Sequence, residues 1–112
     1  MCGIFGIIAP TDSKLPPEKL KSGVLKAFYE SERRGKDSSG ALYVSSSKMV
    51  LTKSQGSVRD LVKTNSFREM LKDSIQEYKD GETFAFFGHT RMATHGSVEV
   101  EANSLEEAVK EV

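Results

Sequence analysis

The opening stretch, MCGIFGII, constrains the chain most strongly, because its apolar and β-branched residues must enter a core strand directly behind the initiator methionine. The residue after methionine is Cys2, the only cysteine in the sequence. A small second residue allows the methionine to be removed, which leaves one residue carrying both a thiol and an α-amine of pKa about 7.7 to 8.0. This pairs a nucleophile with its own base, because the thiolate is the reactive form of cysteine. The alternative is a small buried residue at the start of a strand.

Length and charge exclude several classes of protein. The 112 residues fit one domain, residues 1–112. Because 16 basic residues balance 16 acidic ones, no global field attracts nucleic acid or an anionic membrane surface. A lone cysteine forms no internal disulfide, and no apolar run is long enough to span a bilayer or to act as a secretion signal. We therefore expect a cytoplasmic protein without a membrane or nucleic-acid partner, without a zinc-type metal site and without a cofactor.

Hydrophobic spacing and turn residues predict an α+β chain. The first half is expected to contain a strand over Gly3–Ala9 that is buried on both faces, a helix over about 17–32, a loop over Ser31–Gly40, and hairpin strands over Ala41–Val44 and Lys48–Lys53. A short helix over Ser57–Lys63 and a helix that opens with a Ser66/Glu69 capping box and ends at Asp80–Gly81 are expected to follow. The last expected elements are a strand over Glu82–Gly88 and a helix from Ser104 to the last residue. That last helix is amphipathic and carries no stop signal, which is typical of a chain that is shortened or that docks on something else.

The segment GHTRMATHG places polar side chains at the exit of a buried strand. Arg91 is a fixed cation suited to gripping a carboxylate through two parallel hydrogen bonds, and Thr94 and His95 suit a neighbouring polar group. The alternatives are a surface ion pair for Arg91 and structural hydrogen bonds for the histidines. A metal site built from Cys2, His89 and His95 is not required by the spacing, so no metal is predicted.

The segment RRGKDSSG breaks the helical pattern with two glycines, charges and small hydroxyl residues. It contains Arg34, Gly35, Asp37 and Ser38. One interpretation is a turn whose backbone N–H groups face the thiol, and the other is an ordinary solvated connection. Sequence spacing does not choose between them.

MCGIFGI at the N-terminus, RRGKDSSG after the first helix and GHTRMATHG after a buried strand, in that order, resemble the class II glutamine amidotransferases, a branch of the N-terminal nucleophile hydrolases. The three motifs are most similar to those of the glutaminase domains of glucosamine-6-phosphate synthases. Members of this family fold as an αββα sandwich of two mostly antiparallel sheets between helix layers. The resemblance therefore implies that fold for this chain.

The resemblance also implies roles for individual residues. Cys2 would attack the side-chain amide of L-glutamine, with its own amine moving the proton, to give a thioester and ammonia, and water would then release glutamate. Arg91 would hold the α-carboxylate of glutamine, with Thr94 and His95 lining the same pocket. A loop around the nucleophile would close over the N-terminus. Its members would be Arg34, Gly35, Asp37 and Ser38.

The sequence departs from the family in two respects. Met92 stands where synthase-like members usually carry tryptophan, which implies a differently shaped pocket wall. The family's asparagine-glycine oxyanion hole and a later aspartate that holds the substrate amine do not appear by Val112, since Asn103 is followed by Ser104. Losing one oxyanion donor typically lowers the rate by about 10² to 10³. We therefore expect a sandwich that is incomplete and truncated at the C-terminus, with weak or no turnover by this polypeptide alone.

Three functions are compatible with these sequence features. The first is a glutamine amidotransferase whose ammonia passes to a synthase outside this chain, with an oligomer also allowed. The second is a non-catalytic glutamine-binding or regulatory subunit that lacks the oxyanion hole. The third is an N-terminal nucleophile amidase that acts on another amide.

Overall fold

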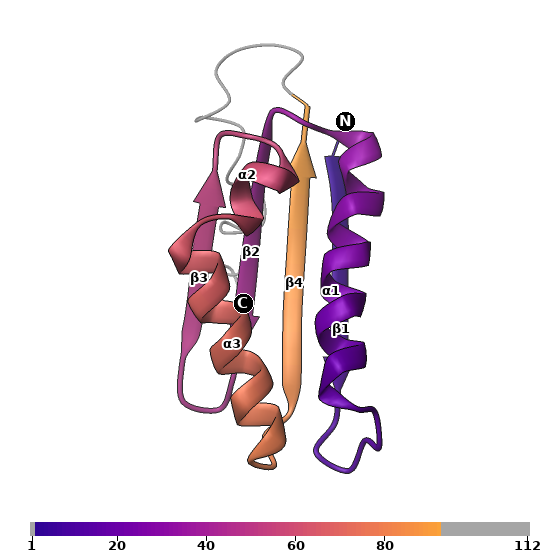
Figure 1. The fold of residues 1–112 in the computed structure, drawn as a ribbon, viewed down its shortest axis with the longest axis vertical. Coiled ribbons are helices and arrows are strands. Elements are labelled where there is room, and N and C mark those ends of the chain that lie inside the picture. The colour runs from indigo at the N-terminus through magenta and orange to yellow at the C-terminus, as the bar shows by residue number, and fades with distance from the viewer. Residues whose placement is uncertain (1, 93–112) are drawn as a thin grey trace.

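The computed structural model describes residues 2–92, which form an α+β arrangement of helices and one sheet (Figure 1). This confirms the predicted class. In chain order the elements are β1 (Cys2–Ala9), α1 (Pro17–Ser31), a 3-10 turn η1 (Glu32–Arg34), β2 (Ser38–Val44), β3 (Met49–Ser54), α2 (Val58–Val62), α3 (Asn65–Lys79) and β4 (Phe84–Arg91).

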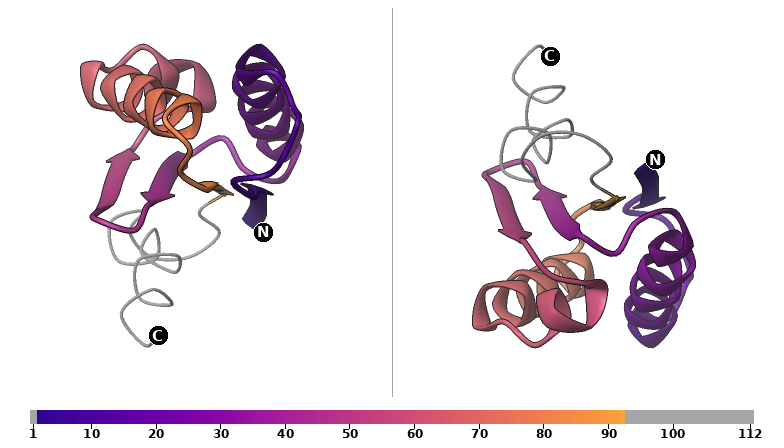
Figure 2. Two further views of the ribbon diagram at one scale, coloured as in Figure 1. Left: turned by 90° about the horizontal axis from the view of Figure 1, so that it is seen from below. Right: turned by 90° about the horizontal axis from the view of Figure 1, so that it is seen from above.

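The sheet has the strand order β1-β4-β2-β3, and every neighbouring pair is antiparallel. The first and last strands of the described chain are therefore hydrogen-bonded partners, with Cys2 opposite Arg91 and Ala9 opposite Phe84. Figure 2 shows the three helices on one face of this sheet. The described residues thus make two layers, and they leave the second sheet of the expected sandwich outside what the structure shows.

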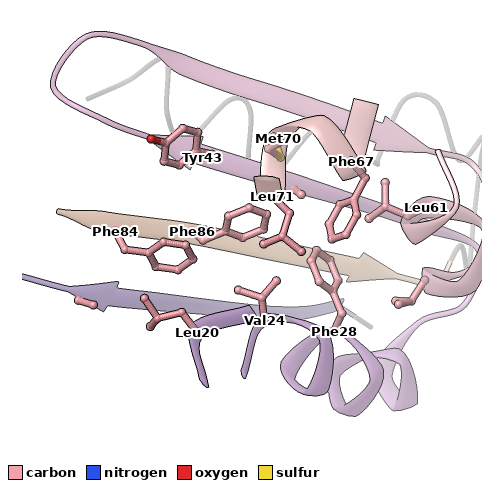
Figure 3. Close-up of a cluster of buried hydrophobic side chains, with 13 residues drawn as sticks. Leu20, Val24, Phe28, Tyr43, Leu61, Phe67, Met70, Leu71, Phe84 and Phe86 are labelled. Atoms are coloured by element: carbon pink, nitrogen blue, oxygen red, sulfur yellow. The ribbon is translucent and has the colours of Figure 1, made fainter. Parts of the chain in front are cut away.

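The core lies between the helices and the sheet (Figure 3). Helix α1 begins at Pro17, a position where proline loses no hydrogen bond, and it turns Leu20, Val24 and Phe28 inward at helical spacing. The ring of Phe28 meets that of Phe67 from α3 at a centroid distance of 5.6 Å, edge to face. Such pairs contribute about 0.5 to 1.5 kcal/mol beyond their buried area. The aromatic contacts therefore fix the helices against the sheet.

One glycine in β4 allows this packing. A Cβ atom at Gly88 would lie 2.0 Å from the Phe5 ring and 2.8 Å from the Phe28 ring. Those rings stack edge to face at 4.8 Å directly over the Gly88 backbone. The absent side chain therefore lets α1 approach β1 and β4 closely.

The prediction that Gly3–Ala9 is buried on both faces is wrong for the described residues. Ile4 and Ile8 are 63% and 65% exposed. The reason is that β1 is an edge strand, and the described helices cover only the face to which Phe5 and Ile7 project.

The predicted capping box of Ser66 and Glu69 is also wrong. The N-cap of α3 is Thr64, whose hydroxyl accepts a hydrogen bond from the Phe67 N–H at 3.2 Å. Ser66 lies inside the helix, and its hydroxyl is 2.9 Å from the hydroxyl of Thr52 on β3. The Ser66 hydroxyl, which the local sequence pattern predicted as the helix cap, therefore contacts a distant strand instead.

The structured segments around the predicted loop are longer than expected. Residues 32–34 form a 3-10 turn and β2 begins at Ser38, so the loop over Ser31–Gly40 is confirmed only in its middle. Strand β4 continues past Gly88 to Arg91. The polar residues at these ends gain backbone partners from β1 and β2, which hydrophobic patterning does not reveal.

Candidate functional site

Three residues from distant parts of the sequence lie in one row across the sheet. The register pairs Cys2 of β1 with Arg91 of β4, and pairs the same Arg91 with Ser38 of β2. Directly opposed residues in antiparallel strands project to the same face, with Cβ atoms about 4.5 to 5.5 Å apart. The row therefore brings one residue of each sequence motif to the same end of the sheet.

This row projects from the face opposite the helices. The neighbouring Thr90 hydroxyl donates to the Ser31 carbonyl at the end of α1, at 2.6 Å. The neighbouring Ser39 hydroxyl donates to the carbonyl oxygen of Gly56, just before α2, at 3.3 Å. Since successive strand residues alternate between faces, Arg91 and Ser38 point the other way.

The segment between η1 and β2 packs on the backbone that carries Arg91. A Cβ atom at Gly35 would lie 2.1 Å from the Arg91 carbonyl carbon and 2.5 Å from the Met92 nitrogen. The Asp37 N–H donates to the Arg91 carbonyl oxygen at 2.9 Å. The glycine and the hydrogen bond together set where the end of β4 lies relative to this loop.

Replacing Gly35 with alanine is expected to lower the free energy of unfolding by about 1 to 3 kcal/mol, because the added methyl must push the Arg91 backbone away. Urea denaturation measures this change. Gly23→Ala in α1 is the matched control, since its added Cβ meets only the Ile7 side chain at an ordinary 3.6 Å. Alanine there should stabilise the helix by about 0.5 to 1 kcal/mol. Equal changes in the free energy of unfolding for the two variants would contradict the close approach of Gly35 to the Arg91 backbone.

The row combines a buried cation with an accessible thiol. Arg91 is 7% exposed and Ser38 is 2% exposed, whereas Cys2 is exposed. Within the described chain the Ser38 hydroxyl oxygen is buried without a hydrogen-bond partner. A guanidinium held in a low-dielectric setting interacts more strongly with a carboxylate than it does in water. The arrangement is chemically suited to an anionic group bound beside a nucleophile.

His89 lies in the next row, opposite Ile4 on β1 and Gly40 on β2. It is 2% exposed. Burial, and secondarily the positive charge of Arg91, lower the pKa of His89 below its ordinary value. The imidazole is therefore neutral at neutral pH, and it adds no second cation to the site.

The lowered pKa of His89 predicts a loss of stability in acid. Below the ordinary pKa of about 6.5 the unfolded chain binds a proton at His89 that the folded chain rejects until the pH falls below the lowered value. The free energy of unfolding should then fall with decreasing pH by up to about 1.4 kcal/mol per pH unit over that window. The His89→Gln variant should lack this component. If urea denaturation gave the same dependence of the free energy of unfolding on pH for both proteins, His89 would not be the source of the acid sensitivity.

A hollow borders Cys2 at the edge of the sheet. It has a volume of about 400 Å³, and its other lining residues are Gly3, Ile4, Glu30, Ser31 and Arg34. The structure thus brings Arg34 of the predicted loop beside Cys2. Glu30 and Ser31 were missed by the sequence reasoning. Their signal was helical spacing, since they precede Arg34 by about one turn.

Two predicted site residues, Thr94 and His95, lie outside the described residues, as does the helix predicted from Ser104. Met92 follows Arg91 and is 43% exposed. Among residues 2–92, no group of three histidine, cysteine or acidic side chains is placed to hold a metal ion. No helix in this range has the length and apolar character needed to cross a bilayer.

Comparison with curated proteins finds relatives over 86% of the chain. The chain is 36% identical over 96 residues to the glutamine–fructose-6-phosphate aminotransferase [isomerizing] of Sulfurisphaera tokodaii. Proteins of the same name from Sulfolobus acidocaldarius and Aquifex aeolicus are 32% and 36% identical over 96 residues. The resemblance to the class II glutamine amidotransferases is confirmed. Relatives of this kind use glutamine, as their names state, which agrees with a glutamine amidotransferase role for the matched region.

The match covers a small part of each of these relatives. The chain spans 14% of the length of the Sulfurisphaera and Sulfolobus proteins and 13% of the Aquifex protein. No protein-family model matches the chain, and no solved structure gives a significant match. The relatives therefore establish kinship with glutamine-dependent aminotransferases.

Proposed function

We propose that this chain carries the glutaminase half-reaction of a glutamine amidotransferase, the hydrolysis of L-glutamine to glutamate and ammonia. The observation that carries the proposal is the register that sets Cys2 beside Arg91 across β1 and β4. It sets a thiol and a guanidinium on adjacent strands, which supports the proposed roles of Cys2 as nucleophile and Arg91 as carboxylate-binding cation. The names of the relatives support glutamine as the molecule that both groups contact.

The chemistry starts with removal of Met1, which frees the α-amine of Cys2. This amine takes the thiol proton, and the sulfur attacks the side-chain amide carbon of glutamine. The carbon–nitrogen bond then breaks, the proton passes from the ammonium to the leaving nitrogen, and ammonia departs from a thioester. Water adds to the thioester carbonyl, the carbon–sulfur bond breaks, and glutamate leaves with the thiol restored.

Arg91 is proposed to bind the α-carboxylate of glutamine. In extended glutamine the α-carboxylate and side-chain amide carbons lie roughly 5 Å apart, which is close to the spacing of directly opposed side chains. A substrate lying along the row therefore reaches both groups at once. The buried guanidinium strengthens this grip, because water competes weakly for a group that is 7% exposed.

The remaining site residues have supporting roles in this proposal. Arg34 borders the hollow at Cys2, Gly35 and Asp37 hold the Arg91 backbone, and the Ser38 hydroxyl stands in the same row. Two further pocket residues are proposed from the motif alone. They are Thr94 and His95.

The fold proposed for the whole unit is the N-terminal nucleophile hydrolase αββα sandwich. The described sheet and helices would be one half, and a second sheet would cover the helix-free face. The exposed side chains of Ile4 and Ile8, and the 57% exposed Met49, support this, because they are large apolar groups on that face. Ammonia would pass to a synthase part outside residues 1–112, as the longer relatives suggest.

Intact mass spectrometry and a glutamate-release assay on the purified polypeptide test the proposed function. The expected results are a mass lacking Met1 and slow release of glutamate from glutamine, without release of aspartate from asparagine. A retained methionine would contradict the amine-base mechanism. Saturable glutamine binding without glutamate release would favour the non-catalytic alternative. Release of aspartate from asparagine, with no glutamate released from glutamine, would favour an amidase of different specificity.

A further inference from the structure

A surface groove runs between α1 and α3, in the helix layer rather than at the row containing Cys2. Its volume is about 680 Å³, which is in the range of sites that hold ligands or peptide segments. The two helices lie side by side on the same face of the sheet (Figure 2). The groove belongs to neither the nucleophile row nor the hollow beside it.

The floor of the groove is apolar and incompletely covered. Leu25 of α1, Val62 of α2 and Ile75 of α3 are partly buried hydrophobic residues that line it. Tyr29 stands at its edge and is 47% exposed. Leu25 and Tyr29 each follow a residue of the buried stripe of α1, so this helix has a second apolar edge turned toward α3.

The rim of the groove is basic. Lys21 of α1 and Arg68, Lys72 and Lys79 of α3 line it, against a single acidic residue, Glu18. Among residues 2–92, none of these four cations forms an ion pair. Arg68 and Lys72 are like charges one turn apart, an arrangement that costs an isolated helix about 0.2 to 0.5 kcal/mol. The positive rim is local, because the whole chain has a net charge of zero.

We propose that this groove is a docking site for an acidic amphipathic helix of a partner polypeptide. An amphipathic helix binds by laying its apolar stripe into a hydrophobic groove, and the apolar floor between α1 and α3 offers such a groove. Glutamates flanking that stripe would meet Lys21 on one side and the α3 cations on the other. The charge complementarity selects an acidic helix and fixes its position along the groove. This proposal does not depend on the glutaminase chemistry.

The test is the affinity of a labelled helical peptide of about 15 residues, with leucine on one face and glutamate on the others, for the full chain by fluorescence anisotropy. The Arg68→Glu/Lys72→Glu double variant is expected to bind at least about tenfold more weakly, since two attractions become repulsions. A peptide with lysine in place of glutamate should bind the double variant more tightly than it binds the parent chain. Such binding would show that the variant is folded and that its groove is intact. Ile75→Ala should also weaken binding.

Lys19→Glu/Lys63→Glu is the matched control, because both lysines are exposed and lie outside the groove while the net charge changes equally. Its affinity for the acidic peptide should fall less than about threefold, as expected for exposed charges that do not contact the peptide directly. Equal losses in both double variants would overturn the proposal, as would the absence of saturable binding. Binding of phosphatidylglycerol vesicles that depends on Arg68 and Lys72, without binding of the peptide, would also overturn it.

Discussion

Glutamine turnover is expected to disappear in the Cys2→Ala variant, while glutamine binding stays nearly unchanged. The substitution removes the only thiol in the chain, and no thioester forms without it. Removing the nucleophile of a covalent mechanism typically lowers kcat by about 10⁶, so even the weak turnover expected of this chain should fall below detection. Because Arg91 and not Cys2 would hold the α-carboxylate, the dissociation constant for glutamine should remain close to that of the parent chain.

Release of glutamate and calorimetric titration with glutamine measure the two quantities in the same preparation. The N-terminus should be processed in this variant as well, since alanine is also small. Turnover that survives in Cys2→Ala would show that another group is the nucleophile. Loss of binding together with turnover would mean that the thiol is part of the recognition site.

The second large effect is expected from Arg91→Ala, which should weaken glutamine binding by about 10² to 10³. Two charge-assisted hydrogen bonds to the α-carboxylate are lost in a site where the side chain is 7% exposed. Arg91→Lys should recover only part of the affinity, because an ammonium keeps the charge but lacks the planar fork.

Arg33→Ala is the matched control for this experiment. The Arg33 side chain is 80% exposed and contacts Glu30 at 3.8 Å, so its removal should leave glutamine affinity unchanged. Equal affinities of Arg91→Ala and the parent chain would show that the carboxylate is held elsewhere. A fall in kcat with an unchanged KM would instead assign Arg91 to the transition state.

The elements of this fold were largely predictable because their local signals are strong. The spacing of Leu20, Val24 and Phe28 marks α1, and the polar turn between two largely apolar runs marks the β2–β3 hairpin. Where prediction was wrong, a long-range contact decided the outcome. The hydroxyl of Ser66 meets Thr52 rather than capping α3, and β1 lies at an edge that no local pattern indicates.

The candidate site was predictable as motifs and not as geometry. The chemistry of Cys2 and Arg91 follows from their residue types, but their opposition depends on the pairing of the first strand with the last. The close approach of Gly35 to the Arg91 backbone also needs the three-dimensional structure, since residues so far apart in sequence share no local signal. Glu30 was missed because a charged residue in an exposed helical turn is usually only solvated.

Cys2 and Arg91 are proposed to act on the same molecule, and the selectivity of Cys2 alkylation distinguishes this from two independent roles. Diazo-oxo-norleucine carries the α-carboxylate of a glutamine analogue, whereas iodoacetamide carries none. Mass spectrometry gives the labelling rate of Cys2 by each reagent in the parent chain and in Arg91→Ala. The variant should react about 10² to 10³-fold more slowly with the glutamine analogue and at an unchanged rate with iodoacetamide. An equal change for both reagents, or no change for either, would contradict it.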